Sequence, residues 1–194
     1  MKLEPLSRAS PQEQLSPSDT ALYQAIVGSL SYLMNCSRPD LAFAINRLAQ
    51  FTSCPAERHL IAAKHTPRYL HHTTSSCLVL GPSSNPNKTP TPLSELRIQG
   101  WFDASWADDP DDRRSMFGYA IVYDCSVLLW KSKKHRATTL STTDAEYVAA
   151  TEITRELSFI RNIFNELGIP FLTPVQLHGD NINANNLANS TYIL

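Results

Sequence analysis

A run of turn-forming residues near the middle of the chain, GPSSNPNKTPTP at 81–92, divides the sequence into two parts. Proline fixes φ and lacks a backbone donor, and glycine, asparagine and serine favour turns, so neither a helix nor a strand is expected there. The apolar pattern is helical before this run and strand-like after it. We therefore expect a disordered tail at 1–20, a helical segment at 21–80, a linker at 81–96 and an α/β domain at 97–194.

The composition excludes several classes of protein. Seventeen Lys and Arg against 18 Asp and Glu give a net charge of −1, which argues against a strongly basic coat protein and an acidic tail. No apolar run approaches the roughly 18 residues that a membrane span needs. The first five residues, MKLEP, lack the apolar stretch of a signal peptide. We expect an intracellular protein of the cytoplasm or nucleus, not secreted and without a membrane partner.

The helical segment contains three apolar stripes at helical spacing. The first includes Leu22 and Leu30 and has Ser18 or Asp19 available as its N-cap. The third contains Pro67, and because proline in a helix interior costs on the order of 3 kcal/mol, we expect a kink or an early stop near Thr66. No chemical motif falls in this segment.

The C-terminal part predicts an α/β domain with a mixed sheet. A long helix, with Thr143 as a possible cap, carries an apolar stripe from Ala149 to Leu167 and ends at Gly168. Strands are expected before and after it, and a further helix begins at Asn183. The expected strands are 97–104, 117–123, 127–130, with 137–140 as an extension of the third, and 175–180.

Three acidic residues fall where sheet-based enzymes place their ligands: Asp103 in the first strand, Glu146 at the start of the long helix, and Asp180 at the end of the last strand. Converging carboxylates repel one another unless cations are present. Mg²⁺ prefers carboxylate and water oxygens, and a pair of Mg²⁺ ions suits phosphodiester cleavage. The three acids are therefore candidate metal ligands.

Each acid also has a purely structural interpretation. Thr143 and Glu146 fit a capping box, in which Glu146 only closes the start of the helix. Asp180, followed by Asn181, fits a turn. Asp103 is harder to explain structurally, because Asp is depleted from strand interiors.

A series of motifs resembles the polyprotein of copia-type retrotransposons, in its ribonuclease H region and the preceding end of the reverse transcriptase. The resemblance extends over about residues 20–190, in the family's order. The matching stretches are YQAIVGSL at 23–30, RPDLA at 38–42, DASWA at 103–107, RRSMFGY at 113–119, WKSKK at 130–134, LSTTDAEY at 140–147 and GDN at 179–181.

This resemblance implies a ribonuclease H fold that cleaves the RNA strand of RNA–DNA hybrids with two Mg²⁺ ions. Asp103, Glu146 and Asp180 would be three of its four metal-binding carboxylates, and the remaining parts of a retroelement polyprotein would be partners. The paired aspartates of the polymerase are absent, so polymerisation is not expected. The family's fourth acid lies downstream of the last helix, beyond Leu194, which makes the domain C-terminally truncated. The alternative is a catalytically inactive relic with weak nucleic-acid binding.

A basic cluster follows the third strand. It consists of Lys131, Lys133, Lys134 and Arg136, with His135 among them. Such a cluster is often a solvated turn, but beside a metal site it predicts contacts with nucleic-acid phosphates. The tryptophans, Trp101, Trp106 and Trp130, are expected in the core, with a stacking surface as the alternative.

Overall fold

The computed structural model describes residues 6–80, 98–123 and 126–189. These residues belong to two compact units. The first comprises Met1–Leu78 with Asp109–Arg113, and the second comprises Val79–Asp108 with Arg114–Leu194. The predicted linker at 81–96 and residues 124 and 125 of the predicted turn lie outside the described residues.

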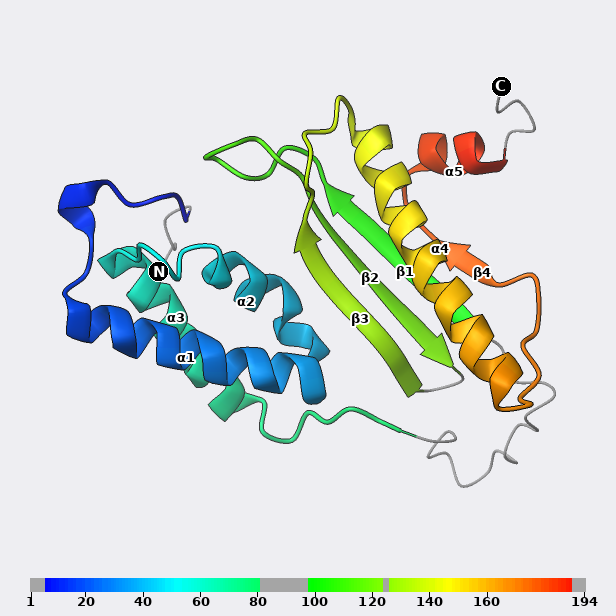
Figure 1. The fold of residues 1–194 in the computed structure, drawn as a ribbon, viewed down its shortest axis with the longest axis horizontal. Coiled ribbons are helices and arrows are strands. Elements are labelled where there is room, and N and C mark those ends of the chain that lie inside the picture. Colours follow the sequence, from blue (N-terminus) through cyan, green and yellow to red (C-terminus); the bar gives the residue numbers. More distant parts are fainter. Residues whose placement is uncertain (1–5, 81–97, 124–125, 190–194) are drawn as a thin grey trace. The chain divides into compact units, whose positions relative to one another are not determined.

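The first unit is helical and packs three α-helices around one core (Figure 1). Its apolar stripes meet on the inside, where the Tyr23 hydroxyl donates a hydrogen bond to the Leu48 carbonyl oxygen at 2.7 Å. The elements are η1 (Pro11–Glu13), α1 (Pro17–Cys36), η2 (Pro39–Leu41), α2 (Ala42–Ala49) and α3 (Glu57–His72).

Three details of the first unit differ from our expectations. The N-cap of α1 is Ser16, whose side chain accepts a hydrogen bond from the Asp19 backbone, so the helix begins inside the expected 1–20 tail. Arg58 also donates to the backbone oxygens of Ser7 and Arg8, which fixes part of that tail on α3. Helix α3 continues through Pro67 to His72 instead of stopping near Thr66. Packing of this helix against α1 and α2 outweighs the local cost of the proline.

The second unit is a four-stranded mixed sheet with the strand order β3-β2-β1-β4. Strands β1 and β2 pair antiparallel, as do β2 and β3, whereas β4 pairs parallel with β1. This confirms the α/β class with a mixed sheet. The elements are β1 (Ile98–Ser105), β2 (Met116–Tyr123), β3 (Ser126–Lys134), α4 (Thr142–Glu166), β4 (Gln176–His178) and α5 (Ile182–Asn189).

Helix α4 lies across one face of this sheet (Figure 1) and closes the second core. Alternate residues of β1 and β2, among them Phe102 and Ile121, face the apolar stripe of α4 at Ala149, Ile153 and Leu157. Gly168 follows the helix with φ +67°, which agrees with the expected C-terminal glycine.

Two local expectations in the second unit are wrong. The N-cap of α4 is Ser141, whose hydroxyl accepts from the Asp144 backbone at 3.1 Å, and not Thr143. Strand β3 runs on to Lys134, while residues 137–140 form no strand. Pairing with β2 along its whole length extends β3 beyond its apolar part. None of the described helices is both long and apolar enough to cross a membrane.

Candidate metal centre

The sheet topology brings the three predicted acids to one place, although 77 positions separate Asp103 from Asp180. Asp103 lies near the end of β1, opposite Gly118 of β2. Strand β4 runs parallel to β1 and pairs Trp101 with His178, so the chain leaves β4 beside Asp103 and carries Asp180. Glu146 projects from the first turns of α4.

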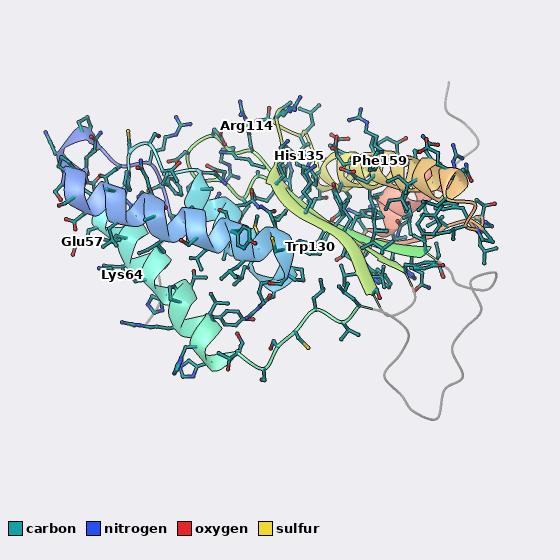
Figure 2. The ribbon with its side chains drawn as sticks, turned by 60° about the horizontal axis from the view of Figure 1, so that its bottom comes forward. Glu57, Lys64, Arg114, Trp130, His135 and Phe159 are labelled. Atoms are coloured by element: carbon teal, nitrogen blue, oxygen red, sulfur yellow. The ribbon has the colours of Figure 1, made fainter. Side chains whose placement is uncertain are left out.

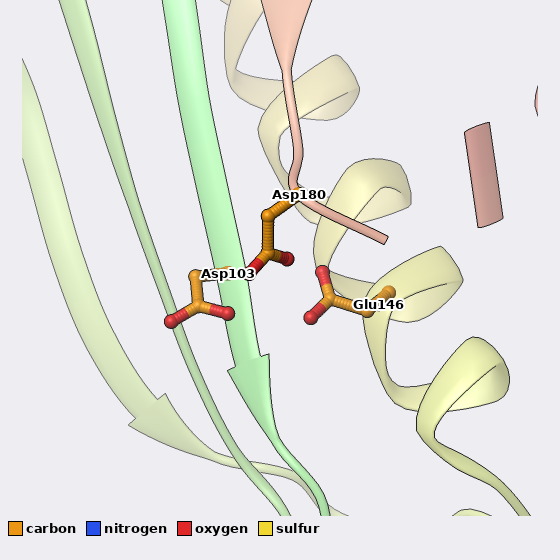
Figure 3. A group of neighbouring side chains, drawn as sticks. All are labelled: Asp103, Glu146 and Asp180. Atoms are coloured by element: carbon orange, nitrogen blue, oxygen red, sulfur yellow. The ribbon is translucent and has the colours of Figure 1, made fainter. Parts of the chain in front are cut away.

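The carboxyl groups of Asp103, Glu146 and Asp180 face one another (Figure 3). One oxygen from each of the three lies within 4.8 Å of the others. Asp103 and Asp180 are exposed to solvent, whereas Glu146 is buried. The cluster therefore combines a buried carboxylate with two that are open to a ligand from solution.

Glu146 is held by the sheet and does not close its own helix. Its Oε1 accepts a hydrogen bond from the Ala104 backbone N–H at 3.1 Å. Its Oε2 is buried and has no hydrogen-bond partner within the part of the chain that the structure describes. Buried polar atoms are normally paired, so an orphaned carboxylate oxygen that faces two further carboxylates indicates a missing positive partner.

The electrostatics of the cluster raise the pKa of Glu146 to about 7. Burial is the main cause, because it disfavours the charged form, and the neighbouring charges of Asp103 and Asp180 add to it. The hydrogen bond from Ala104 acts in the opposite direction. Either a proton or a cation must offset the clustered charge.

Packing around Gly179 fixes the position of Asp180. A Cβ at Gly179 would lie 2.5 Å from the ring of Phe102, so only glycine lets β4 approach β1 this closely. The Asn185 side chain donates to the Gly179 carbonyl oxygen at 2.9 Å. Asn181 accepts from the Ala184 backbone at 3.1 Å and thereby caps α5. The turn that we expected at Asp180 and Asn181 is thus made by Asn181.

Sequence reasoning missed the supporting groups of this site, namely the Ala104 N–H, Phe102 and Gly179. The backbone N–H carries no sequence signal. Gly179 carried one, because a glycine at the end of a strand and next to a candidate ligand indicates a close approach of the backbone.

An open pocket of about 560 Å³ adjoins the cluster, and Asp103 and Asp180 both line it. Its aromatic wall is Trp101, which stacks on His178 with ring centroids 4.9 Å apart and an angle of 16° between the rings. Trp101 is 40% exposed, so the expectation of a core position is wrong for this residue. The face of β1 that carries Asp103 is therefore partly aromatic.

The residues of the predicted basic cluster have different surroundings. Lys131 pairs with α4, because its Nζ lies 3.4 Å from a carboxylate oxygen of Glu156. The same Nζ lies 6.0 Å from the ring centre of Tyr119 on β2. Lys133, Lys134 and Arg136 instead line a second pocket, described below. The structure thus places Lys131 apart from the other three.

The donor set fits divalent magnesium. All three side chains offer hard carboxylate oxygens, which Mg²⁺ prefers. Oxygens bound to one Mg²⁺ ion at about 2.1 Å lie about 3–4 Å apart, so the present spacing needs only a small side-chain adjustment. The orphaned Glu146 Oε2 is the observation that favours a cation at this place.

Comparison with known proteins places the chain among retroelement sequences. It is 38% identical, over 147 residues and 76% of its length, to the retrovirus-related Pol polyprotein from transposon TNT 1-94 of Nicotiana tabacum. The chain is thus a homologue of a segment of the retrovirus-related Pol polyproteins of transposons. This Pol homologue is also 35% identical, over 88% of its length, to the Pol polyprotein from transposon RE1 of Arabidopsis thaliana.

The Pol homologue spans only 10–11% of the length of these polyproteins. It is also similar, at 38% identity over 134 residues, to the secreted RxLR effector protein 161 of Plasmopara viticola, and this match covers 69% of the Pol homologue and 87% of the effector. No family model and no solved structure matches the Pol homologue. The matches to Pol polyproteins support a retroelement-derived chain.

Proposed function

We propose that the second unit of this Pol homologue is a ribonuclease H-type nuclease that cleaves the RNA strand of RNA–DNA hybrids with Mg²⁺. The observation that carries the proposal is the gathering of Asp103, Glu146 and Asp180 within 4.8 Å around an unpartnered buried oxygen. The mixed sheet with a helix across it agrees with the fold that this function requires, and the Pol family makes an RNA–DNA hybrid the expected substrate. Other parts of a retroelement polyprotein are the proposed protein partners.

Each residue of the site has a distinct part in this proposal. Asp103 and Asp180 would offer exposed oxygens to the metal and to its bound water. Glu146 would supply Oε2, while the Ala104 N–H holds its Oε1 and so fixes the orientation of the carboxylate. Mg²⁺ held by these three carboxylates would supply the Lewis-acid chemistry that phosphodiester hydrolysis needs. The stacked rings of Trp101 and His178 would lie against the substrate beside the carboxylates.

The experiment is a cleavage assay with the full chain, Mg²⁺ and a hybrid labelled on the RNA strand. We expect shortened RNA from the hybrid, no cleavage of the DNA strand, and loss of activity in EDTA. Asp103→Asn, Glu146→Gln and Asp180→Asn should each lower the rate at least about a hundredfold, because each removes a metal ligand.

The matched control is Asp144→Asn. Asp144 is an exposed acid two residues from Glu146 on the same helix and is not in the carboxylate cluster, so this change should leave cleavage within about twofold. Cleavage that persists in Asp103→Asn would contradict the proposal. So would a folded protein that shows neither cleavage nor Mg²⁺ binding, measured as a thermal shift that the Glu146→Gln change removes.

A further inference from the structure

A second pocket, of about 470 Å³, lies in the second unit between the end of β3, the segment 135–140 and α4. The helix residues that line it, Asp144, Val148, Glu152 and Arg155, follow one another at spacings of 4, 4 and 3 and so share one face of α4. Glu146 projects from the opposite flank of the helix at 100° per residue. The pocket is therefore a site separate from the carboxylate cluster.

The charges around this pocket are mainly positive. Lys133, Lys134 and Arg136 line it from the strand end and the following segment. Within the described residues neither Lys133 nor Arg136 forms an ion pair. Two acids also face the pocket: Glu152 is bound to Arg155 at 2.8 Å, and Asp144 is exposed near the start of α4. The side chains of Lys133 and Arg136 are therefore available to bind an anion here.

The lining also includes an apolar part, here called the apolar wall, and one buried imidazole. Phe117 and Val148 contribute carbon surface, and the edge of the His135 ring packs against Phe117 with centroids 4.9 Å apart. His135 is only 4% exposed, and its Nε2 has no partner in the described part of the chain. Figure 2 shows this residue at the junction of β3 and α4. Burial lowers the pKa of the imidazole, so the ring is neutral at neutral pH.

We propose that this pocket binds a nucleoside phosphate. The phosphate would lie against Lys133 and Arg136, the base against the apolar wall, and a polar edge of the base would pair with His135 Nε2. Inorganic phosphate alone would not contact the apolar wall or His135. A purely apolar ligand would not interact with the positive charges of Lys133 and Arg136. The volume lies within the usual range of about 300–1,000 Å³ for small-ligand sites. The nucleotide is either free or one unit of a single strand.

Binding is measured in EDTA with the full chain and its Asp103→Asn variant, so that a failure of the proposed nuclease activity does not affect the result. The probes are AMP, inorganic phosphate and a fluorescently labelled ten-nucleotide single strand. We expect AMP to bind at least about tenfold more tightly than phosphate and to compete with the oligonucleotide. A strand that binds far more tightly than AMP identifies a polynucleotide as the source, and equal affinities identify a free nucleotide.

Arg136→Gln and His135→Phe should each weaken AMP binding about tenfold, because each removes one charged or buried hydrogen-bond partner. If His135→Phe does not fold, Val148→Trp fills the pocket without changing a charge and should prevent AMP binding. Lys131→Gln is the matched control, because Lys131 lies on β3 close in sequence to Arg136 but does not line the pocket, and it should leave the affinity within twofold. Equal losses in Lys131→Gln and Arg136→Gln, competition by phosphate as strong as by AMP, or no binding of AMP would overturn the proposal.

Discussion

Each unit buries an ionisable side chain, but only one of the two makes all of its hydrogen bonds. His59 of the first unit is fully buried and uses both ring nitrogens: Nδ1 accepts from the Ala56 N–H, and Nε2 donates to the Ser7 carbonyl oxygen, each at 2.9 Å. Its ring also stacks on Phe51 at 4.1 Å. Glu146 of the second unit is 4% exposed and leaves one oxygen unused beside two other acids.

This difference separates a structural polar group from a functional one. A buried group whose hydrogen bonds are all made stabilises the fold around it. A buried charged group whose bonds are incomplete destabilises the fold unless a ligand completes them. The comparison therefore makes His59 part of the core of its unit and supports the proposal that Glu146 is a metal ligand. The four predictions below test it.

His59→Ala should lower the stability of the first unit by about 3–4 kcal/mol, because the change leaves a cavity and two buried backbone groups without partners. The loss is measured by urea unfolding followed by far-UV circular dichroism. His71→Ala, at an exposed position near the end of the same helix, is the control and should cost less than about 0.5 kcal/mol. A loss below 1 kcal/mol in His59→Ala would contradict the comparison.

Glu146→Gln should have the opposite effect and stabilise the metal-free second unit by about 2–3 kcal/mol at pH 8, because it removes a buried charge whose pKa is about 7. All three tryptophans lie in this unit, so their fluorescence during urea unfolding reports on it selectively. The same variant should lose the stabilisation that Mg²⁺ gives to the parent protein. Destabilisation of the metal-free protein would show that Glu146 is a structural group.

Two glycine substitutions should change the free energy of unfolding in opposite directions. Gly179→Ala should cost about 2 kcal/mol, because the new Cβ would meet the Phe102 ring at 2.5 Å, and should weaken Mg²⁺ binding by displacing Asp180. Gly28→Ala in α1 has nothing within 4 Å of its new Cβ and should stabilise the first unit by about 0.5–1 kcal/mol. Thermal unfolding and Mg²⁺ titration measure both. Unchanged Mg²⁺ affinity in Gly179→Ala would show that Gly179 does not position Asp180.

The pH response of the two groups should also be opposite. Burial lowers the pKa of His59, so the first unit loses stability as the pH falls below 6.5, where the unfolded chain takes up the proton more readily. The raised pKa of Glu146 means that its contribution becomes less favourable as the pH rises from 5 to 7, by about 2 kcal/mol. His135, whose pKa is also lowered, acts against this trend within the second unit.

The Glu146 contribution is therefore obtained as the difference between the parent and Glu146→Gln at each pH. Mg²⁺ affinity should fall by up to tenfold per pH unit below pH 7, because the ion competes with the proton on Glu146. A difference between the two proteins that does not change with pH would show that Glu146 is charged throughout this range.

The sequence predicted the elements of the second unit and the three acids, because both leave local signals. The apolar stripe of α4 and the alternation along β1 follow from burial on one face. Asp103 could be singled out because aspartate is rare inside strands. For Glu146 the sequence alone left capping and ligation open, and the contact with Ala104, 42 positions away, shows only that the carboxylate does not cap its own helix.

Features that depend on tertiary packing were not predictable. Pro67 has a strong local preference to end a helix, yet the packing of α3 carries the helix past it. The cap of α4 is Ser141 and not the expected Thr143, because the Ser141 hydroxyl reaches the Asp144 N–H. The pocket beside β3 depends on the packing of α4, which supplies Glu156 as the partner of Lys131 and forms the wall opposite Lys133 and Arg136.

The short parallel pairing of β4 has a consequence for motion. Only three residue pairs, Gln99–Gln176, Gly100–Leu177 and Trp101–His178, join β4 to β1, whereas β1 and β2 pair over eight. Detachment of β4 therefore requires far fewer hydrogen bonds to break than global unfolding, and it removes Asp180 while Asp103 and Glu146 stay in place. Amide hydrogen exchange along β4 should consequently slow when Mg²⁺ is added and remain unchanged along β2, so that this strand edge itself reports occupancy of the site.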